Sequence, residues 1–166
     1  MFKSIFSKYL ATFTVILIAC ITAILYAVSS RIATDSYNIQ NKMMSNSAGT
    51  TALLIDIYLE EDGYERIYDS FGEKSDLQKI IDYSASNVDA DLYVFELGGR
   101  LVGTSDEDYA NGAHYLSESA LFKMLSTKES YSLSNVDRFF KTNRMNCYHV
   151  SYVGDMPFIV LVSMSN

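Results

Sequence analysis

Residues 91–105, DLYVFELGGRLVGTS, decide how the second half of the chain folds. Two apolar runs, 91–96 and 100–105, are joined through Gly98-Gly99. Short runs rich in aromatic and β-branched residues are typical of strands, and a Gly pair between two of them is typical of a hairpin turn. The sequence therefore predicts an antiparallel β-hairpin here.

Three further strands are predicted toward the carboxyl end, at about 130–140, about 146–153 and 158–165, with residues 155–157 turning the last pair. The segment FIVLV at 158–162 is apolar at every position. A strand of this kind is buried on both faces, so we expect it in the middle of the sheet. The sequence thus predicts five antiparallel strands.

Two short helices are predicted within the same sheet domain, which we place at 73–166. One begins at Ser75, because Gln78 three positions later completes a capping box. The other begins at Ser117, after a loop that covers 106–115. Helices on one face of an antiparallel sheet make an α+β fold.

Residues 9–28, YLATFTVILIACITAILYAV, contain no charge. A helix of twenty residues is about 30 Å long, which matches the hydrocarbon core of a bilayer. We therefore expect a transmembrane helix over 9–29, with the lipid bilayer as its surroundings.

Two alternatives to a retained anchor exist. Ala27-Val28-Ser29 has the small residues of a signal-peptide cleavage site, but the apolar run is longer than the usual 7–15 residues. Residues 17–20, LIAC, resemble a lipobox, but the polar tether expected after it is replaced by further apolar residues.

Charge predicts the orientation of the anchor. Residues 1–8 contain Lys3 and Lys8 and no acid, whereas the other 11 of the 13 Lys and Arg residues lie after residue 30 with all 20 Asp and Glu. Basic residues favour the cytoplasmic side, so we place 1–8 in the cytoplasm and 30–166 outside it. An acidic domain is unsuited to nucleic acid.

A long helix is predicted over 30–60, continuing from the membrane. Gly49 would weaken it or let it bend. Its apolar residues have the spacing of a heptad seam, interrupted by Asn46 and Thr50. Either this seam packs on the chain's own domain, or it pairs two copies in a homodimer. The apolar seam residues are Ile32, Ile39, Met43, Leu53 and Ile57.

Residues suited to catalysis or metal binding are scattered. Cys20 lies in the membrane run and Cys147 outside it, so the two cannot form a disulfide within one chain. His114 and His149 have no nucleophile or ligand cluster near them, and the acidic loop 106–115 lacks the ligand spacing of an EF-hand. We expect no catalytic residue, metal or cofactor, and hence no enzyme in this chain.

Residues 89–105 and 148–163 resemble the Cache/PAS-like extracytoplasmic sensor domains of bacterial transmembrane receptors. The first segment is similar to that family's first hairpin, and the second to its closing strands. The chain departs from the family pattern at 96–99, where ELGG replaces the commoner Asp-x-x-Gly turn, and in the missing Gly near the start of the last strand.

The resemblance implies a small-molecule cavity between the sheet and the loop and helix at 105–125. Tyrosine offers an apolar face and a hydroxyl, and Arg138 has the geometry to hold a carboxylate. The alternative is that these are ordinary core and surface residues of a ligand-free domain. The candidate binding residues are Tyr109, Tyr115, Tyr131, Arg138, Tyr148, His149 and Tyr152.

In such receptors the last strand leads into a second membrane helix and a cytoplasmic output module, neither of which lies within 1–166. The resemblance therefore implies the signal-input region of a longer protein, most like a sensor histidine kinase of a two-component system. Chemoreceptors and cyclic-dinucleotide enzymes share this layout. A membrane-anchored extracytoplasmic adaptor or partner-binding protein is the alternative from another class.

Overall fold

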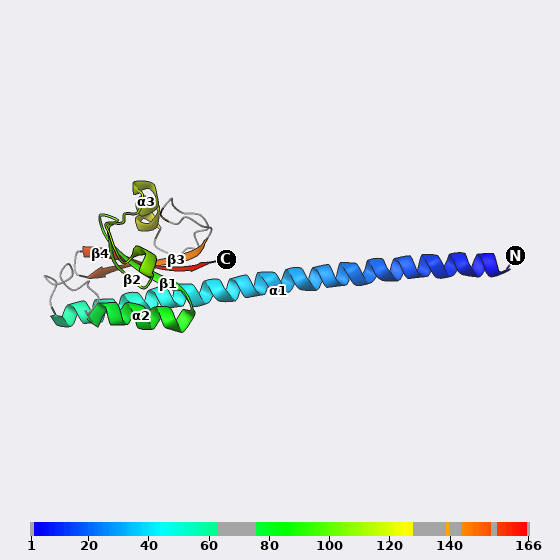
Figure 1. Ribbon diagram of the computed structural model, residues 1–166, viewed down its shortest axis with the longest axis horizontal. Coiled ribbons are helices and arrows are strands. Elements are labelled where there is room, and N and C mark those ends of the chain that lie inside the picture. The colour runs from blue at the N-terminus through cyan, green and yellow to red at the C-terminus, as the bar shows by residue number, and fades with distance from the viewer. Residues whose placement is uncertain (1, 63–75, 128–138, 140–143, 154–155, 166) are drawn as a thin grey trace. The chain divides into compact units, whose positions relative to one another are not determined.

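The computed structural model describes residues 2–62, 76–127, 139, 144–153 and 156–165. The chain divides into two compact units, Met1–Gln40 and Asn41–Asn166. Helix α1 (Phe2–Asp62) begins in the first unit and ends in the second (Figure 1). It ends where the sequence predicts, and it continues unbroken through the predicted weak point at Gly49.

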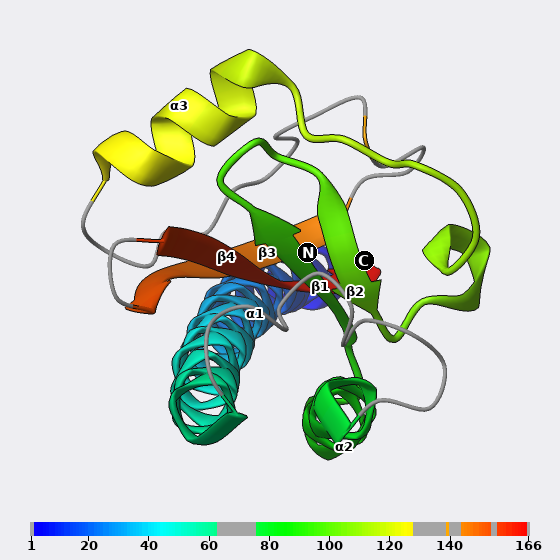
Figure 2. The ribbon, with the colours of Figure 1, turned by 90° about the vertical axis from the view of Figure 1, so that its left-hand side faces the viewer.

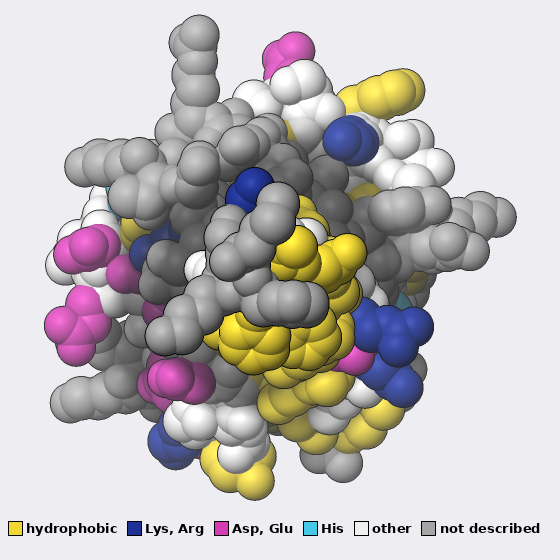
Figure 3. Space-filling model, turned by 90° about the vertical axis from the view of Figure 1, so that its right-hand side faces the viewer, with side chains coloured by type: hydrophobic (Ala, Val, Ile, Leu, Met, Phe, Trp, Pro, Cys, Tyr) yellow, Lys and Arg dark blue, Asp and Glu magenta, His cyan; other side chains and the backbone are white. Residues whose placement is uncertain are grey.

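The first unit exposes apolar side chains on all sides of its helix. Large hydrophobic residues between Ile5 and Val28 are 48–77% exposed. Within the described residues, α1 is the one helix long and apolar enough to cross a membrane, with an 18-residue window of mean hydropathy 2.4. Hydrophobic side chains gather at the centre of the face in Figure 3, which looks onto the amino-terminal end. Such a surface is suited to lipid.

The second unit is built on an antiparallel sheet in the order β2-β1-β4-β3. The strands are β1 (Asp91–Glu96), β2 (Leu101–Thr104), β3 (Arg144–Val153) and β4 (Met156–Ser165). The predicted hairpin is confirmed as β1 and β2, and β4 lies between β1 and β3 as its apolar sequence requires. The described sheet therefore has four strands. The fifth, expected at about 130–140, falls outside the described residues except for Phe139.

The hairpin turn depends on Gly99, whose φ is +76°. A Cβ at this position would make an ordinary contact with the Leu116 side chain at 3.5 Å, so the positive φ rather than lack of space favours glycine here. The Gly99 amide donates to the Glu96 carbonyl at 2.8 Å, and the Leu116 amide donates to the Gly99 carbonyl at 2.8 Å.

The predicted position of the turn before the last strand, at residues 155–157, is wrong. Met156 and Pro157 already belong to β4, where they pair with Val153 and Tyr152 of β3. A proline is tolerated close to the start of a strand because the lost N–H affects the ladder least there. The strand ladder thus extends further toward the turn than the sequence indicates.

Helices cover both faces of the sheet, so the expectation of helices on one face is wrong (Figure 2). Leu92, Val94, Val160 and Val162 pack against α1 and α2 (Asp76–Val88). On the opposite face, a second cluster contains the alternate strand residues and Met124 of α3 (Glu118–Ser126). A central strand that is apolar on both sides requires this double cover.

Helix α1 packs on the sheet with a different stripe from the predicted heptad seam. The buried residues are Met44, Ala48, Ala52, Ile55 and Leu59. The seam residues Ile32, Ile39, Met43, Leu53 and Ile57 are 48–64% exposed, so the interpretation that this seam packs on its own domain is wrong. Small residues on the buried side allow close approach, and a Cβ at Gly49 would lie 3.8 Å from His149 Nδ1.

The helix starts are confirmed where they are described. Ser117 caps α3, its Oγ accepting from the Ala120 amide at 3.3 Å. Ser75, the predicted cap of α2, lies outside the described residues. The predicted loop contains one turn of 3-10 helix, η2 (Glu107–Tyr109).

Candidate ligand-binding cleft

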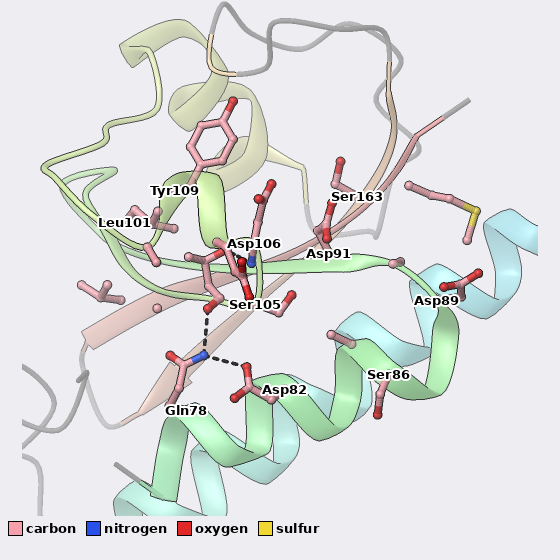
Figure 4. Close-up of a pocket in the computed structure, with 18 of the residues that line it drawn as sticks. Gln78, Asp82, Ser86, Asp89, Asp91, Leu101, Ser105, Asp106, Tyr109 and Ser163 are labelled. Atoms are coloured by element: carbon pink, nitrogen blue, oxygen red, sulfur yellow. Dashed lines mark hydrogen bonds between the residues drawn. The ribbon is translucent and has the colours of Figure 1, made fainter. Parts of the chain in front are cut away.

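A cleft of about 1000 Å³ opens beside the edge strand β2 (Figure 4). Its walls come from α2, the start of β1, β2, η2 and the end of β4. Gln78 joins two of these walls, because its Nε2 donates to Asp82 Oδ1 and to the Thr104 carbonyl, both at 2.8 Å. This volume is sufficient for a small organic molecule.

Carboxylates dominate the charged side chains of the cleft. The described part of the lining contains no Lys or Arg. Negative charges in a concave surface concentrate a negative potential and attract cations from solution. The lining carboxylates are Asp82, Asp89, Asp91, Asp106 and Glu107.

Arg144 of β3 compensates part of this charge from behind the lining. Its Nη1 lies 2.5 Å from Asp91 Oδ2, and its Nη2 lies 3.7 Å from Asp106 Oδ2. Tyr93 completes the cluster, since its hydroxyl accepts from Arg144 Nη1 at 3.1 Å and donates to Asp106 Oδ2 at 2.5 Å. The side chains of Arg144 and Asp106 are only 18% and 12% exposed, so the pair is partly desolvated.

Tyr93 and Arg144 keep their protonation states at neutral pH. Burial, followed by the hydrogen bond to Asp106, raises the pKa of the Tyr93 hydroxyl well above its usual range. Burial works against the charged form of Arg144, but the hydrogen bond with Asp91 and the nearby charges raise its pKa overall. Tyr93 therefore remains a donor and Arg144 remains a cation.

Local turns fix the position of Asp106 at the edge of the cleft. Asp106 caps η2, its Oδ1 accepting from the Asp108 amide at 3.0 Å, and its own amide donates to Thr104 Oγ1 at 3.0 Å. Thr104 in turn donates to the Leu92 carbonyl at 2.9 Å. The Asp side chain suits a cap because its oxygen accepts from a backbone amide that the short helix leaves unpaired.

A buried hydroxyl also lines the cleft. Ser163 of β4 is 0% exposed, and its Oγ has no hydrogen-bond partner among the described residues. It pairs across the sheet with Asp91 on one side and with Asn146 on the other. A buried polar group without a partner costs about 1–3 kcal/mol, so a ligand that binds to it would recover this free energy.

Aromatic rings fill the face of the sheet next to the cleft. Tyr109 stacks on Phe139 with ring centroids 4.9 Å apart and donates its hydroxyl to the Phe139 carbonyl at 2.9 Å. Tyr93 and His114 contact Tyr109 edge-on, at 5.7 and 5.2 Å. Burial raises the pKa of Tyr109, which therefore stays a hydrogen-bond donor.

The structure brings one of the predicted binding residues, Tyr109, to this cleft. Tyr148 is buried and donates to Thr127 Oγ1 at 3.1 Å, while His149 lies near Gly49 of α1. Tyr115 and Tyr152 are 58% and 59% exposed. Tyr131 and Arg138 lie outside the described residues. A binding role for any of the seven stays a prediction.

The sequence interpretation missed Arg144, Asp91, Asp106 and Ser163. One local signal points to Ser163, which interrupts the apolar run of β4. Arg144, Asp91 and Asp106 carry no comparable local signal, because the sheet brings them together from segments far apart in the sequence.

The fold has counterparts among solved structures. No protein-family profile and no curated protein matches the sequence. The sensor domain of Escherichia coli DcuS has a TM-score of 0.51 at 14% identity, over 76% of this chain and 92% of that one. The sensor domain of the Vibrio cholerae histidine kinase DctB has a TM-score of 0.58 at 11% identity, over 87% of this chain.

An extracellular ligand-binding receptor from Desulfohalobium retbaense has a TM-score of 0.57 at 12% identity, over 79% of this chain. This chain spans 57% of the DctB structure and 23% of the Desulfohalobium receptor. The TM-scores of these three structures support a shared fold. Sequence identities this low do not indicate which ligand this chain binds. The chain has the fold of Cache-like extracytoplasmic sensor domains.

Proposed function

We propose that this chain is the signal-input region of a bacterial two-component sensor histidine kinase. The observation that carries the proposal is the combination of a sensor-domain fold shared with DctB, a polar cleft and one apolar helix. A ligand in the cleft would favour one packing of the sheet against α1, and this difference would reach the output module.

The orientation follows from charge: residues 1–8 lie in the cytoplasm and 30–166 outside it. Lys3 and Lys8 precede the apolar run without any acid, which supports this arrangement. Alkaline phosphatase fused after Ser165 should be active in cells, since this reporter folds only outside the cytoplasm. An inactive phosphatase together with a fluorescent GFP fusion at the same site would contradict the orientation.

The exposed seam of α1 supports a parallel homodimer. Leu53 and Ile57 are 57% and 48% exposed, and Asn46 lies at an equivalent heptad position to Leu53. Two copies of this helix would bury the seam against each other. A buried Asn pair favours two strands in a single register. In the homodimer, a shift of α1 in one copy would change how that helix packs against α1 of the other copy.

A chimera tests the input role directly. Residues 1–165 replace the sensor region of DctB, and autophosphorylation is measured in membranes. Ala48→Leu inserts a bulky side chain where α1 packs on the sheet and should change the phosphorylation level. Lys42→Leu, at an exposed position of the same helix, is the matched control. Equal phosphorylation in the parent chimera and both variants would argue against signal input.

A further inference from the structure

We propose that the cleft beside β2 binds a small organic polycation, namely a linear di- or polyamine. The inference rests on the proposed sensor function and specifies the chemistry of its ligand. Three features carry it: the sign of the charges around the cleft, the buried Ser163 hydroxyl, and the size of the cavity (Figure 4).

The charges select a cation. Among the described residues, five carboxylates and no Lys or Arg line the cleft. The guanidinium of Arg144, which lies close to it, is held by Asp91 and Asp106. An anionic ligand would have to displace one of these carboxylates and would still meet the others. Asp82, Asp89 and Glu107 are exposed at the rim and remain accessible to a cation.

Ser163 supplies the second, independent feature. Its Oγ is buried, lines the cleft, and has no hydrogen-bond partner in the described part of the chain. A hydroxyl oxygen accepts a hydrogen bond from an ammonium group, and Asp91 lies directly across from it in the ladder. One end of an amine can therefore bind at Ser163 and Asp91 while the rest extends toward the rim.

Size and the spacing of the acids favour an organic cation over a metal ion. The volume of about 1000 Å³ is far larger than a single ion requires. Among the described residues, no three His, Cys, Asp or Glu side chains lie close enough together to hold a metal. Ammonium groups separated along a chain match acids that are distributed along the cleft.

The first experiment measures spermidine binding to the full chain by calorimetry, in nanodiscs of zwitterionic lipid so that the bilayer does not bind the amine. The triple variant Asp82→Asn, Asp89→Asn, Glu107→Gln should weaken binding about tenfold or more, since it removes three charges that attract the amine. Asn also tolerates the positive φ of Asp89, which is 51°. The matched triple Asp35→Asn, Asp76→Asn, Glu118→Gln removes the same charge away from the cleft and should bind as the parent does.

The second experiment separates binding at the Ser163 hydroxyl from the general attraction of a cation to the carboxylates of the cleft. Ser163→Ala should weaken spermidine binding but leave the free protein equally or more stable, because it removes an unpaired buried hydroxyl. Thr51→Val is the control. Thr51 Oγ1 is also buried without a partner among the described residues, but it lies on α1 and does not line the cleft. Its removal should leave binding unchanged.

Several outcomes would overturn the polyamine proposal: no spermidine binding, equal weakening by the two triples, or Mg²⁺ competing as well as spermidine. Tighter binding of succinate would also overturn it and assign Arg144 to an anionic ligand. None of these results bears on the chimeric kinase, whose response to Ala48→Leu tests the sensor function without any ligand. The two proposals can therefore fail separately.

Discussion

The charge cluster around Arg144 is the residue-scale feature on which the cleft depends. Arg144 holds Asp91 at 2.5 Å and lies 3.7 Å from Asp106, with all three partly buried. Removing a partner from a desolvated ion pair costs more than the pair itself contributes, because the remaining charge is left uncompensated. The stability of this region should therefore respond strongly to the loss of the guanidinium.

Arg144→Met should destabilise the chain by about 2–4 kcal/mol at neutral pH. The loss is expected because the two carboxylates would be left together without the cation that compensates them. Thermal unfolding at neutral pH measures this. Arg100→Met, at an exposed position, is the control, and equal effects in the two variants would contradict the prediction.

Cys147 allows a second residue-scale prediction. Its Sγ lies 2.9 Å from Asn41 Oδ1, and burial raises the pKa of the thiol from 9.0 to about 11. Below pH 9 the thiol is protonated in both states. Between pH 9 and about 11 the unfolded thiol ionises first, so the stability it contributes is lost over this window.

The melting temperature should accordingly fall more steeply from pH 8.5 to 10 in the parent chain than in Cys147→Ala. Thiol labelling gives an independent measure, because the thiolate is the reactive form. With Cys20 replaced by Ala, labelling of Cys147 at pH 7.5 should be much faster in denaturant than in the folded chain. Rapid labelling of the folded chain would contradict the proposed burial.

At the scale of elements, α1 has two apolar stripes with different partners. One, from Met44 to Leu59, packs on the sheet, and the heptad seam remains exposed. The sequence shows the seam more clearly because Leu and Ile are more apolar than the alanines that permit close packing. Periodicity identified the helix but not which side faces the sheet, since that choice depends on a distant surface.

Leu53→Glu should convert the proposed dimer to a monomer, because it places like charges across the seam. Leu54→Glu introduces the same charge at the next exposed position, which lies outside the apolar seam, and should leave the proposed dimer intact. Light scattering after gel filtration in detergent measures the oligomeric state. Equal effects of the two substitutions would argue against this seam as the interface.

The strands were more predictable than the cleft. Alternating and continuous apolar runs located β1, β2, β3 and β4 closely, because burial on one or two faces leaves a direct trace in sequence. The cleft combines residues from 78 to 164. Its composition depends on cross-strand register, such as Asp91 beside Ser163, and local patterns do not determine that register.

At the scale of the whole molecule, the core belongs to the second unit. The buried residues that the structure describes all lie between Met44 and Ser163, and the described side chains from Ile5 to Gln40 are exposed. A fragment of residues 41–166 should therefore fold alone, with helix and strand signals in circular dichroism and a cooperative melt. A fragment of residues 61–166 loses the buried stripe of α1 and should melt without cooperativity. Similar melts for both would contradict this account of the core.

The position of β4 also determines how this domain bears force. All ten of its residues pair with β3 on one side, and the six from Phe158 to Ser163 also pair with β1 on the other. Because these bonds lie perpendicular to the strand, tension applied along β4 loads two ladders in shear at once. The edge strand β2, bonded along one side in the described sheet, would be peeled away one bond at a time. When the chain is pulled from its carboxyl end in a single-molecule experiment, β4 should thus resist a high force and then detach abruptly.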